Sequence, residues 1–192
     1  MTFDRRAFGF PPLAAIAVAK LGVRRALRLG AVVAGLGLGA AAAPSVAEGY
    51  IDDRSTPERV IASLYNALNA GEYARAWSYY AGDAHPTRSY RDFVAGYADT
   101  NLVALRTGAP SEDAGMSKVY TAIPVALRAR QRDGSTAYFS GCYLTLTIAP
   151  GVQDPPFRGT EIIGARLRKA GGPTGEQPPT DCDPAQIPRF SR

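Results

Sequence analysis

The side chains that most often carry out catalysis are scarce in this chain. Its 192 residues include one histidine, His85, and two cysteines, Cys142 and Cys182. One histidine excludes a two-histidine metal site, and a serine–histidine–acid triad would have to use this residue of the loop-like sequence Asp83-Ala84-His85-Pro86. No nucleophile-elbow, zinc-protease or phosphate-loop motif follows residue 47. We therefore expect His85 to be a solvent-exposed loop residue, and we expect neither a metal site nor a cofactor.

One acid and one phenol remain as candidates for acid–base chemistry. An isomerase or dehydratase can use a buried carboxylate as base and a tyrosine as donor to a developing oxyanion. Asp99 and Tyr97 have these types and lie two residues apart. However, Asp99 falls where a helical pattern ends, and an acid there more often begins a turn. The sequence therefore favours a binding or assembly module, with an isomerase- or dehydratase-type enzyme that uses Asp99 and Tyr97 as the alternative.

The two cysteines predict a disulfide. Their number is even, and Cys182 lies in a proline- and glycine-rich tail, residues 171–192, that has no other visible reason to be ordered. A bond from Cys142 to Cys182 would close a loop of ~40 residues and stabilise the fold by a few kcal/mol. Two unpaired thiols, one of them buried in a strand, are the alternative.

The net charge of +5 is concentrated at the N-terminus. Residues 1–47 hold six Lys and Arg against one acid, so residues 48–192 carry 16 basic and 16 acidic side chains. Binding to phosphate backbones requires clustered Lys and Arg on the folded part. The composition therefore predicts no nucleic-acid partner.

The N-terminal segment has the three parts of a signal peptide. An uncharged run, residues 29–43, follows Arg24, Arg25 and Arg28 and leads to the small residues Ser45-Val46-Ala47. We expect cleavage between Ala47 and Glu48 and a protein that is periplasmic or secreted. The alternative is an uncleaved membrane anchor, although the run is shorter than the ~20 residues of a membrane-spanning helix. The pair Arg5-Arg6 fits either twin-arginine export or an extended basic region of a general secretory signal.

Three helices are expected between residues 56 and 99. The first begins at Ser55-Thr56-Pro57-Glu58, where a capping box overlaps a Thr-Pro pair, and ends at Asn69-Ala70-Gly71. The second is short and starts near Tyr73. The third begins at Ser89, and Asp92 can complete its cap. Apolar residues recur at helical spacing in each: Val60, Ile61, Leu64 and Leu68; Tyr73, Ala76, Trp77 and Tyr80; Tyr90, Phe93, Val94 and Tyr97.

Alternating residues predict strands over 102–107, 118–131, 136–148 and 161–169. Asp133-Gly134 between the middle two is typical of a two-residue type I′ hairpin turn. Pairing Arg132 with Ser135 sets Val125 opposite Cys142. One face then carries Val119, Ile123, Val125 and Leu127 with Tyr138, Cys142, Leu144, Leu146 and Ile148. Pro124 has no N–H for this ladder, so we expect a bulge or bend there, with Gly141 opposite, and a strongly curved sheet.

This order of elements resembles the nuclear transport factor 2-like superfamily, the cone-shaped fold that also includes ketosteroid isomerases. The resemblance extends over residues 56–169. It is clearest in two segments, VIASLYNALNAGEYARAW, residues 60–77, and SYRDFVAGY, residues 89–97. The expected class is α+β: three N-terminal helices packed on a strongly curved, mainly antiparallel sheet of about four strands. This domain would span residues 48–170 and be followed by the tethered tail. Because the superfamily includes enzymes, binding modules and assembly domains, the resemblance predicts a fold without a function.

The resemblance also implies a pocket and a dimer surface. A pocket for a small apolar ligand would lie between the helices and the concave sheet face, although aromatic residues at helical spacing often only fill a core. Its expected lining is Tyr65, Trp77, Tyr80, Tyr97, Leu127, Tyr138 and Leu144. A homodimer would form through the outer sheet face, with Tyr120, Ala122, Ala126, Phe139 and Tyr143, unless Arg128, Arg130 and Arg168 keep that face solvated.

Overall fold

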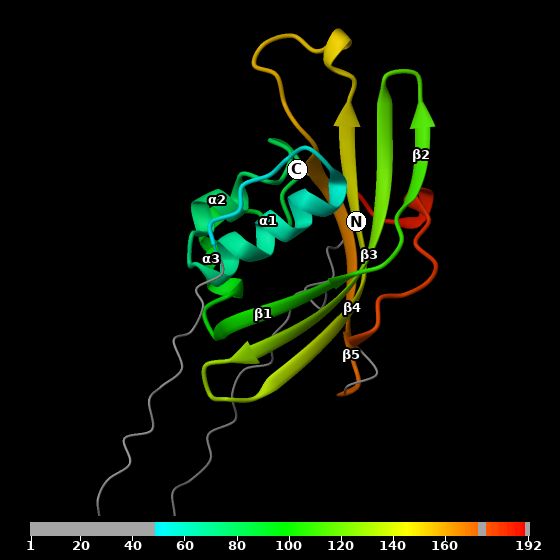
Figure 1. The fold of residues 1–192 in the computed structure, drawn as a ribbon. Coiled ribbons are helices and arrows are strands. Elements are labelled where there is room, and N and C mark those ends of the chain that lie inside the picture. Colours follow the sequence, from blue (N-terminus) through cyan, green and yellow to red (C-terminus); the bar gives the residue numbers. More distant parts are fainter. Residues whose placement is uncertain (1–48, 173–175, 191–192) are drawn as a thin grey trace, which may run out of the picture. The chain divides into compact units, whose positions relative to one another are not determined.

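The computed structural model describes residues 49–172 and 176–190. The expected signal segment and its cleavage site between Ala47 and Glu48 lie outside the described residues. Three α-helices precede five strands in the described part (Figure 1): α1 Pro57–Asn69, α2 Tyr73–Trp77, α3 Tyr90–Gly96, β1 Thr100–Thr107, β2 Ser111–Gly115, β3 Lys118–Gln131, β4 Thr136–Ile148 and β5 Glu161–Ala170. The predicted α+β class is confirmed. Among the helices of this part, none has the length and apolar character needed to span a membrane.

The helix starts follow the capping residues. The Thr56 side chain accepts a hydrogen bond from the Arg59 N–H at 3.3 Å, and Pro57 occupies the first helical position. Ser55 does not form the expected capping box, since it hydrogen-bonds to Asp53 instead. At α3 the predicted cap is confirmed, because the Ser89 hydroxyl accepts from the N–H of the third helical residue at 3.1 Å.

Strand β3 is the longest strand of a sheet in the order β1-β3-β4-β5, and β2 also pairs with β3. Strands β1 and β2 lie end to end along one edge of β3, on either side of Pro124. Because Pro124 has no N–H, the ladder is interrupted there, and its carbonyl accepts only from the Gly108 N–H at 2.9 Å. β2 was not predicted, since its short polar sequence shows no alternation.

The hairpin between β3 and β4 has a three-residue loop rather than the predicted two-residue turn. The Gln131 N–H donates to the Ser135 carbonyl at 2.8 Å, and the Gly134 N–H donates to the Gln131 carbonyl at 3.1 Å. Gly134 has φ +86°, whereas Asp133 is not among the residues with positive φ, so the turn is not type I′. The predicted register is therefore wrong by one residue.

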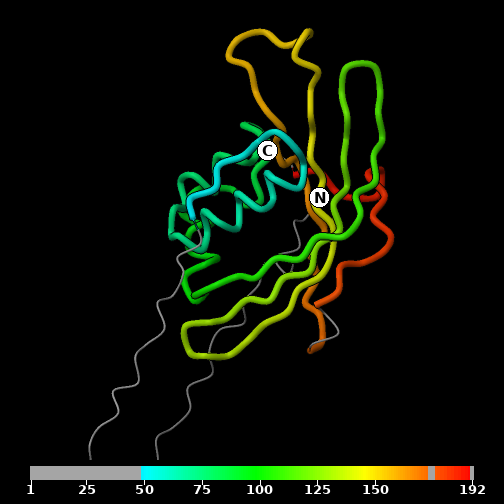
Figure 2. Tube along the Cα trace, viewed as in Figure 1, coloured from blue at the N-terminus to red at the C-terminus, as the bar shows by residue number. Residues whose placement is uncertain are grey.

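This register separates the apolar residues of β4 from those of β3. Val125 lies opposite Gly141, and Pro124 lies opposite Cys142. Cys142 and Leu144 consequently point to the face opposite from Val125, and the single shared apolar face predicted above is wrong. Both faces of the central strands are covered. The helices pack on one face, and the tail crosses the other, which we call the outer face (Figure 2).

The sheet is curved (Figure 1), as predicted, although no bulge interrupts the β3–β4 ladder at Pro124, whose partner is Cys142 rather than Gly141. Gly141 lies one position along β4 from the residue opposite Pro124, and a Cβ atom on it would overlap the backbone of Arg166 in β5. Only glycine allows this close approach of two strands. A bulge in β5 then turns Ile162 toward the helices and Ile163 toward the tail, although strict alternation along the strand would place Ile163 on one face with Ala165 and Leu167.

Candidate functional site

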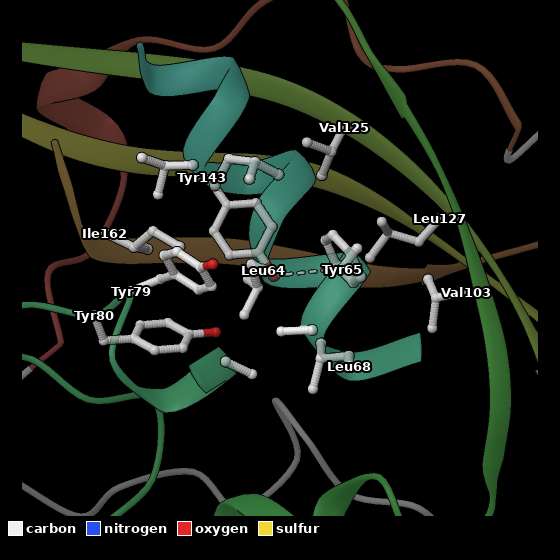
Figure 3. Close-up of a cluster of buried hydrophobic side chains, with 14 of the residues drawn as sticks. Leu64, Tyr65, Leu68, Tyr79, Tyr80, Val103, Val125, Leu127, Tyr143 and Ile162 are labelled. Carbon is white, nitrogen blue, oxygen red and sulfur yellow. Dashed lines mark hydrogen bonds between the residues drawn. The ribbon is translucent and has the colours of Figure 1, made fainter. Parts of the chain in front are cut away.

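Three tyrosines converge between the helices and the sheet (Figure 3), and a fourth, Tyr97, packs against the same core. Tyr65 comes from α1, Tyr80 follows α2, Tyr97 follows α3, and Tyr143 comes from β4. The hydroxyl oxygens of Tyr65 and Tyr143 lie 2.7 Å apart. Tyr65, Tyr80 and Tyr143 are each at most 4% exposed, and the side chains packed around them are apolar. The arrangement places several phenol groups in an otherwise apolar interior.

A tyrosine is already neutral at neutral pH, and burial moves the ionisation of these phenols further away from it. Burial raises the pKa of Tyr65 and of Tyr80 well above the ordinary value. Burial also raises the pKa of Tyr97, and the nearby Tyr143 raises it further. The pKa of Tyr143 rises only to about 12, because the neighbouring hydroxyls of Tyr65 and Tyr80 oppose the effect of burial. At neutral pH the cluster therefore offers neutral O–H donors and no fixed charge.

Tyr97 differs from Tyr65 and Tyr143 in having an unused hydroxyl. It makes no hydrogen bond within residues 49–172 and 176–190, although it is close enough to Tyr143 for the two phenols to interact electrostatically. Its ring packs edge-on against Phe93, 5.2 Å between centroids, and it is only partly buried, as is Trp77. The partly exposed side of the cluster is thus the side of α2 and α3.

His85 does not lie free in a loop as predicted. Its ring stacks on Trp77, with centroids 3.8 Å apart and planes 3° from parallel. This stacking leaves the residue half-buried, and its Nδ1 atom is buried without a hydrogen-bond partner in the described structure. Burial lowers the pKa of His85, and Asp83 partly opposes that shift. A histidine eight residues after a tryptophan carries no sequence signal for such a contact.

The structure brings together most, but not all, of the residues expected to line a pocket. Tyr65, Trp77, Tyr80, Tyr97 and Leu127 lie on the helix side of the sheet. Tyr138 and Leu144 lie on the outer face because of the one-residue change in register. Tyr143 had been expected on the outer face but is central to the cluster. Phe139, expected on the same outer face, packs against the margin of the cluster. Sequence reasoning placed Tyr143 on the wrong face because it assumed a two-residue hairpin loop. The length of that loop decides which face each β4 residue occupies.

The acid–base candidates are not placed together. Asp99 is exposed at the start of β1, where its backbone carbonyl accepts from the Arg132 N–H at 2.8 Å. The Tyr97 hydroxyl lies with the other phenols instead. Within the described residues there is also no group of three or more His, Cys, Asp or Glu side chains placed to hold a metal ion.

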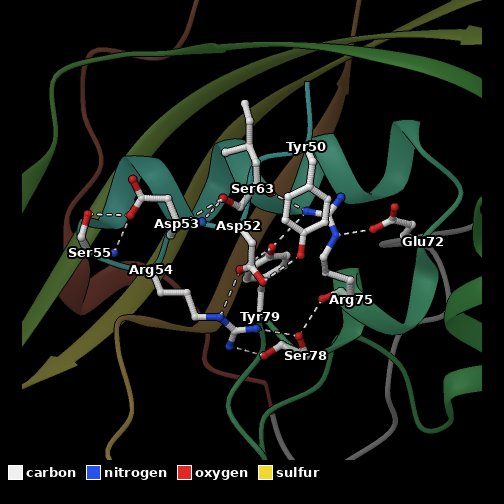
Figure 4. Close-up of polar contacts among 11 residues, drawn as sticks. Tyr50, Asp52, Asp53, Arg54, Ser55, Ser63, Glu72, Arg75, Ser78 and Tyr79 are labelled. Atoms are coloured by element: carbon white, nitrogen blue, oxygen red, sulfur yellow. Dashed lines mark hydrogen bonds and ion pairs between the residues drawn. The ribbon is translucent and has the colours of Figure 1, made fainter. Parts of the chain in front are cut away.

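A polar network fixes the segment that follows the predicted cleavage site (Figure 4). In this network the Tyr79 hydroxyl donates to Asp52 at 2.9 Å and accepts from Arg75 at 3.2 Å. The guanidinium of Arg54 lies 4.5 Å from the centre of the Tyr79 ring. Residues 49–55 are thereby held across α1 and α2. Because Tyr79 is held, the tyrosine that follows it is directed into the interior.

The predicted disulfide is confirmed. Cys142 and Cys182 are bonded, with Cα atoms 5.9 Å apart and a separation of 40 positions in sequence. The bond fixes the tail on the outer face, where Cys182 and Ile187 pack against Ala122 and Leu144. Such a bond fits a non-reducing, exported environment.

Comparison with known proteins gives a similarity of fold. No family model matches the chain, and no curated protein matches it. A scytalone dehydratase-like protein from Novosphingobium aromaticivorans is similar in structure at 9% identity, with a TM-score of 0.45 over 59% of this chain and 81% of that chain. A nuclear transport factor 2-like superfamily protein from Salmonella enterica serovar Typhimurium is similar at 15% identity, with a TM-score of 0.42 over 62% of this chain and 92% of that chain. The structure itself has the order of elements that the sequence resemblance implied, with three helices followed by a mainly antiparallel sheet.

Proposed function

We propose that this domain is an exported binding module that holds a small, uncharged and largely apolar ligand against the tyrosine cluster. The observation that carries the proposal is the unused hydroxyl of Tyr97, beside the buried and hydrogen-bonded phenols of Tyr65 and Tyr143. Tyr97 is only partly buried, and its hydroxyl is not among the buried polar atoms without a partner, so a molecule outside the cluster can reach it. A ligand oxygen that accepts from Tyr97 would gain a hydrogen bond worth about 0.5–1.5 kcal/mol.

The chemistry of the cluster limits the class of ligand. Its members are neutral at physiological pH, and burial raises the pKa of each of the four tyrosines further above it. A charged ligand would lose its hydration here without gaining a counter-charge, which is strongly unfavourable. A neutral molecule with an apolar body and one carbonyl or ether oxygen fits both the surrounding apolar side chains and the phenol donors.

Entry from the side of α2 and α3 follows from the exposure of the residues there. Trp77, Val94 and Tyr97 are partly buried, whereas Leu64 and Val125 behind them are fully buried. A ligand that enters on this side would displace few contacts of the deep core. It would meet the Trp77 ring and the Tyr97 hydroxyl first.

The alternative is an isomerase or dehydratase built on the same cluster. Tyr143, which hydrogen-bonds with Tyr65, is the phenol that such an enzyme would use, because its pKa of about 12 is raised less than those of its neighbours. The reaction would also need a base, and the expected one, Asp99, is exposed outside the cluster. We therefore favour binding over catalysis, and export is supported by the disulfide.

The test is binding of the neutral fluorescent probe Nile red to residues 48–192, oxidised and purified without detergent, together with native mass spectrometry for a retained small molecule. Tyr97→Phe should weaken probe binding by about 3- to 10-fold, which corresponds to one hydrogen bond. Tyr138→Phe, on the outer face, is the matched control and should leave binding unchanged. No probe binding and no retained molecule, or equal effects of the two variants, would contradict the proposal.

A further inference from the structure

Five arginines project from one half of the outer face. The ladder pairs Arg106 of β1 with Ala126, which pairs with Ser140, which in turn pairs with Arg168 of β5. Residues that are directly opposite in an antiparallel ladder share a face. The arginine face, as we call this surface, therefore consists of Arg106, Arg128, Arg130, Arg166 and Arg168, on the same side as the disulfide.

The spacing of the arginines on this surface is regular. Arg128 and Arg130 are two residues apart on β3, and Arg166 and Arg168 are two residues apart on β5, so each pair spans ~7 Å along its strand. Strand β4 lies between them, which sets the two strands about 10 Å apart, and the pairs are also displaced along the strands, because Arg128 lies beside Tyr138 whereas Arg168 lies beside Ser140. A single small anion would reach only one pair. A chain of anionic groups would reach both.

The tail already supplies one carboxylate to this surface. The two carboxylate oxygens of Glu176 lie 4.0 Å from Arg106 and 3.6 Å from Arg128. The remaining three, Arg130, Arg166 and Arg168, make no ion pair with any other described residue. Two arginines that share one carboxylate show that this surface can bind carboxylate groups. The other three arginines could bind carboxylates in the same way, and they have no such partner within the described residues.

The unpaired arginines of β5 line a depression rather than a flat surface. Arg166 and Arg168 border a hollow of about 270 Å³ with Ser140, Pro179 and Asp181. Arg166 also borders a neighbouring hollow of about 580 Å³ under the tail. Tyr138 lies on the same face and is half-buried between the two pairs of arginines. The surface thus combines guanidinium groups, a hydroxyl and an aromatic ring.

We propose that the arginine face binds an acidic polysaccharide, a polymer with repeated carboxylate groups on sugar rings. The planar guanidinium forms paired hydrogen bonds with carboxylates, and two arginine pairs that lie apart on different strands suit a repeating polyanion. The ring of Tyr138 offers an apolar surface on which a sugar ring can pack. The net charge of the domain does not reveal this surface, since residues 48–192 have equal numbers of acidic and basic side chains. This site is separate from the tyrosine cluster on the other side of the sheet.

Binding of polygalacturonate to the oxidised domain at low salt tests this proposal. Replacing Arg166 and Arg168 together by Gln should weaken binding at least 10-fold, and binding should weaken as salt is added. Glu176→Gln should strengthen binding about 2- to 5-fold, because it removes the competing carboxylate. Replacing Arg88 and Arg91 by Gln, exposed residues near α3, makes the same change in net charge and should alter binding less than twofold.

Comparison ligands separate the proposal from its competitors. Neutral dextran should not bind. Tighter binding of oligo-dT or of phosphatidylglycerol vesicles than of polygalacturonate would overturn the choice of a polysaccharide, and equal losses in the two double-arginine variants would overturn the choice of surface. Nile red binding should be unaffected by all of these variants, so the result does not depend on the proposed function of the tyrosine cluster.

Discussion

Tyr143 shows how one side chain connects the sheet to the helices. Its hydroxyl lies 2.7 Å from that of Tyr65 on α1, and their rings meet edge to face at 6.4 Å. Tyr80 belongs to the same buried cluster. These contacts join α1, the segment after α2 and β4 at one buried point. A polar group in an apolar interior must have a hydrogen-bond partner to avoid a desolvation cost, so these contacts also fix the position of the helices on the sheet.

The buried phenols should make the fold sensitive to alkali. The pKa of Tyr143 in the folded protein is about 12, above its ordinary value of 10, and the pKa values of Tyr65, Tyr80 and Tyr97 are raised further. The stabilisation from keeping these groups neutral is fully present below pH ~10 and is lost as pH rises through the folded pKa. Each tyrosine that ionises only in the unfolded chain should lower the free energy of unfolding by about 1.4 kcal/mol per pH unit.

Absorbance of tyrosinate at 295 nm, with urea unfolding at pH 8, 10 and 11, checks this prediction. We expect part of the tyrosine signal to appear only when the protein unfolds, and the free energy of unfolding to fall steeply above pH 10. Tyr143→Phe should make that fall shallower. Complete titration of all ten tyrosines near pH 10 in a folded protein would contradict the assignment of the cluster.

Sequence reasoning at the residue scale succeeded where a residue's setting is local. Tyr65 and Tyr97 were expected in the interior because their helices show clear apolar stripes, and both are there. His85 was misjudged because its partner, Trp77, lies across a loop whose path no periodicity predicts. The unused hydroxyl of Tyr97 could not be anticipated either, since hydrogen-bond partners depend on elements distant in sequence.

At the scale of elements, the limits of β3 and β4 were predicted correctly, but their register was not. The sequence Arg132-Asp133-Gly134-Ser135 fits two loops: a type I′ turn with Asp-Gly at its centre, and a three-residue loop with glycine in the left-handed position. The two differ by one residue, and one residue exchanges the faces of the whole of β4. Apolar residues on both sides of β4 were the available signal that both of its faces are covered.

Gly141 should be one of the least replaceable residues of the sheet. A Cβ atom there would overlap the backbone of Arg166, so Gly141→Ala must push β4 and β5 apart. We expect a loss of about 1–3 kcal/mol in the free energy of unfolding. Gly151→Ala is the control, because nothing lies within 4 Å of its added methyl group. Urea unfolding of both variants measures the difference, and equal stabilities would show that the strands do not approach as described.

At the scale of the whole described structure, the order of helices and sheet could be predicted because each helix and strand carries its own local pattern. The path of the tail could not, since proline- and glycine-rich sequence has no periodicity, and only Cys182 indicated that it returns to the sheet. Further contacts hold the tail in place. The Ser111 hydroxyl donates to the Cys182 carbonyl, and the Arg189 guanidinium lies 4.6 Å from the centre of the Tyr120 ring. The tail thus acts as a second layer on the outer face.

This layer bears directly on the homodimer that was expected through the outer face. Ala122, Leu144 and Ile163 are at most 6% exposed in the single chain because Cys182 and Ile187 cover them. A second copy could reach these residues only after the tail has left. We therefore expect dimerisation through this face to depend on release of the tail, and the disulfide to oppose it.

Light scattering coupled to size-exclusion chromatography, with and without the disulfide, tests this dependence. Replacing Cys142 and Cys182 together by Ser should cost about 2–4 kcal/mol of stability and free the tail to detach. The oxidised chain should then show less dimer than the variant at equal concentration, because exposing a contiguous apolar surface favours association. Adding Leu144→Glu to the serine variant should abolish the extra dimer, because a charge at this position cannot be buried between two copies. An oxidised dimer as stable as that of the serine variant, or one unaffected by Leu144→Glu, would place the contact on another surface and leave the tail with a purely structural role.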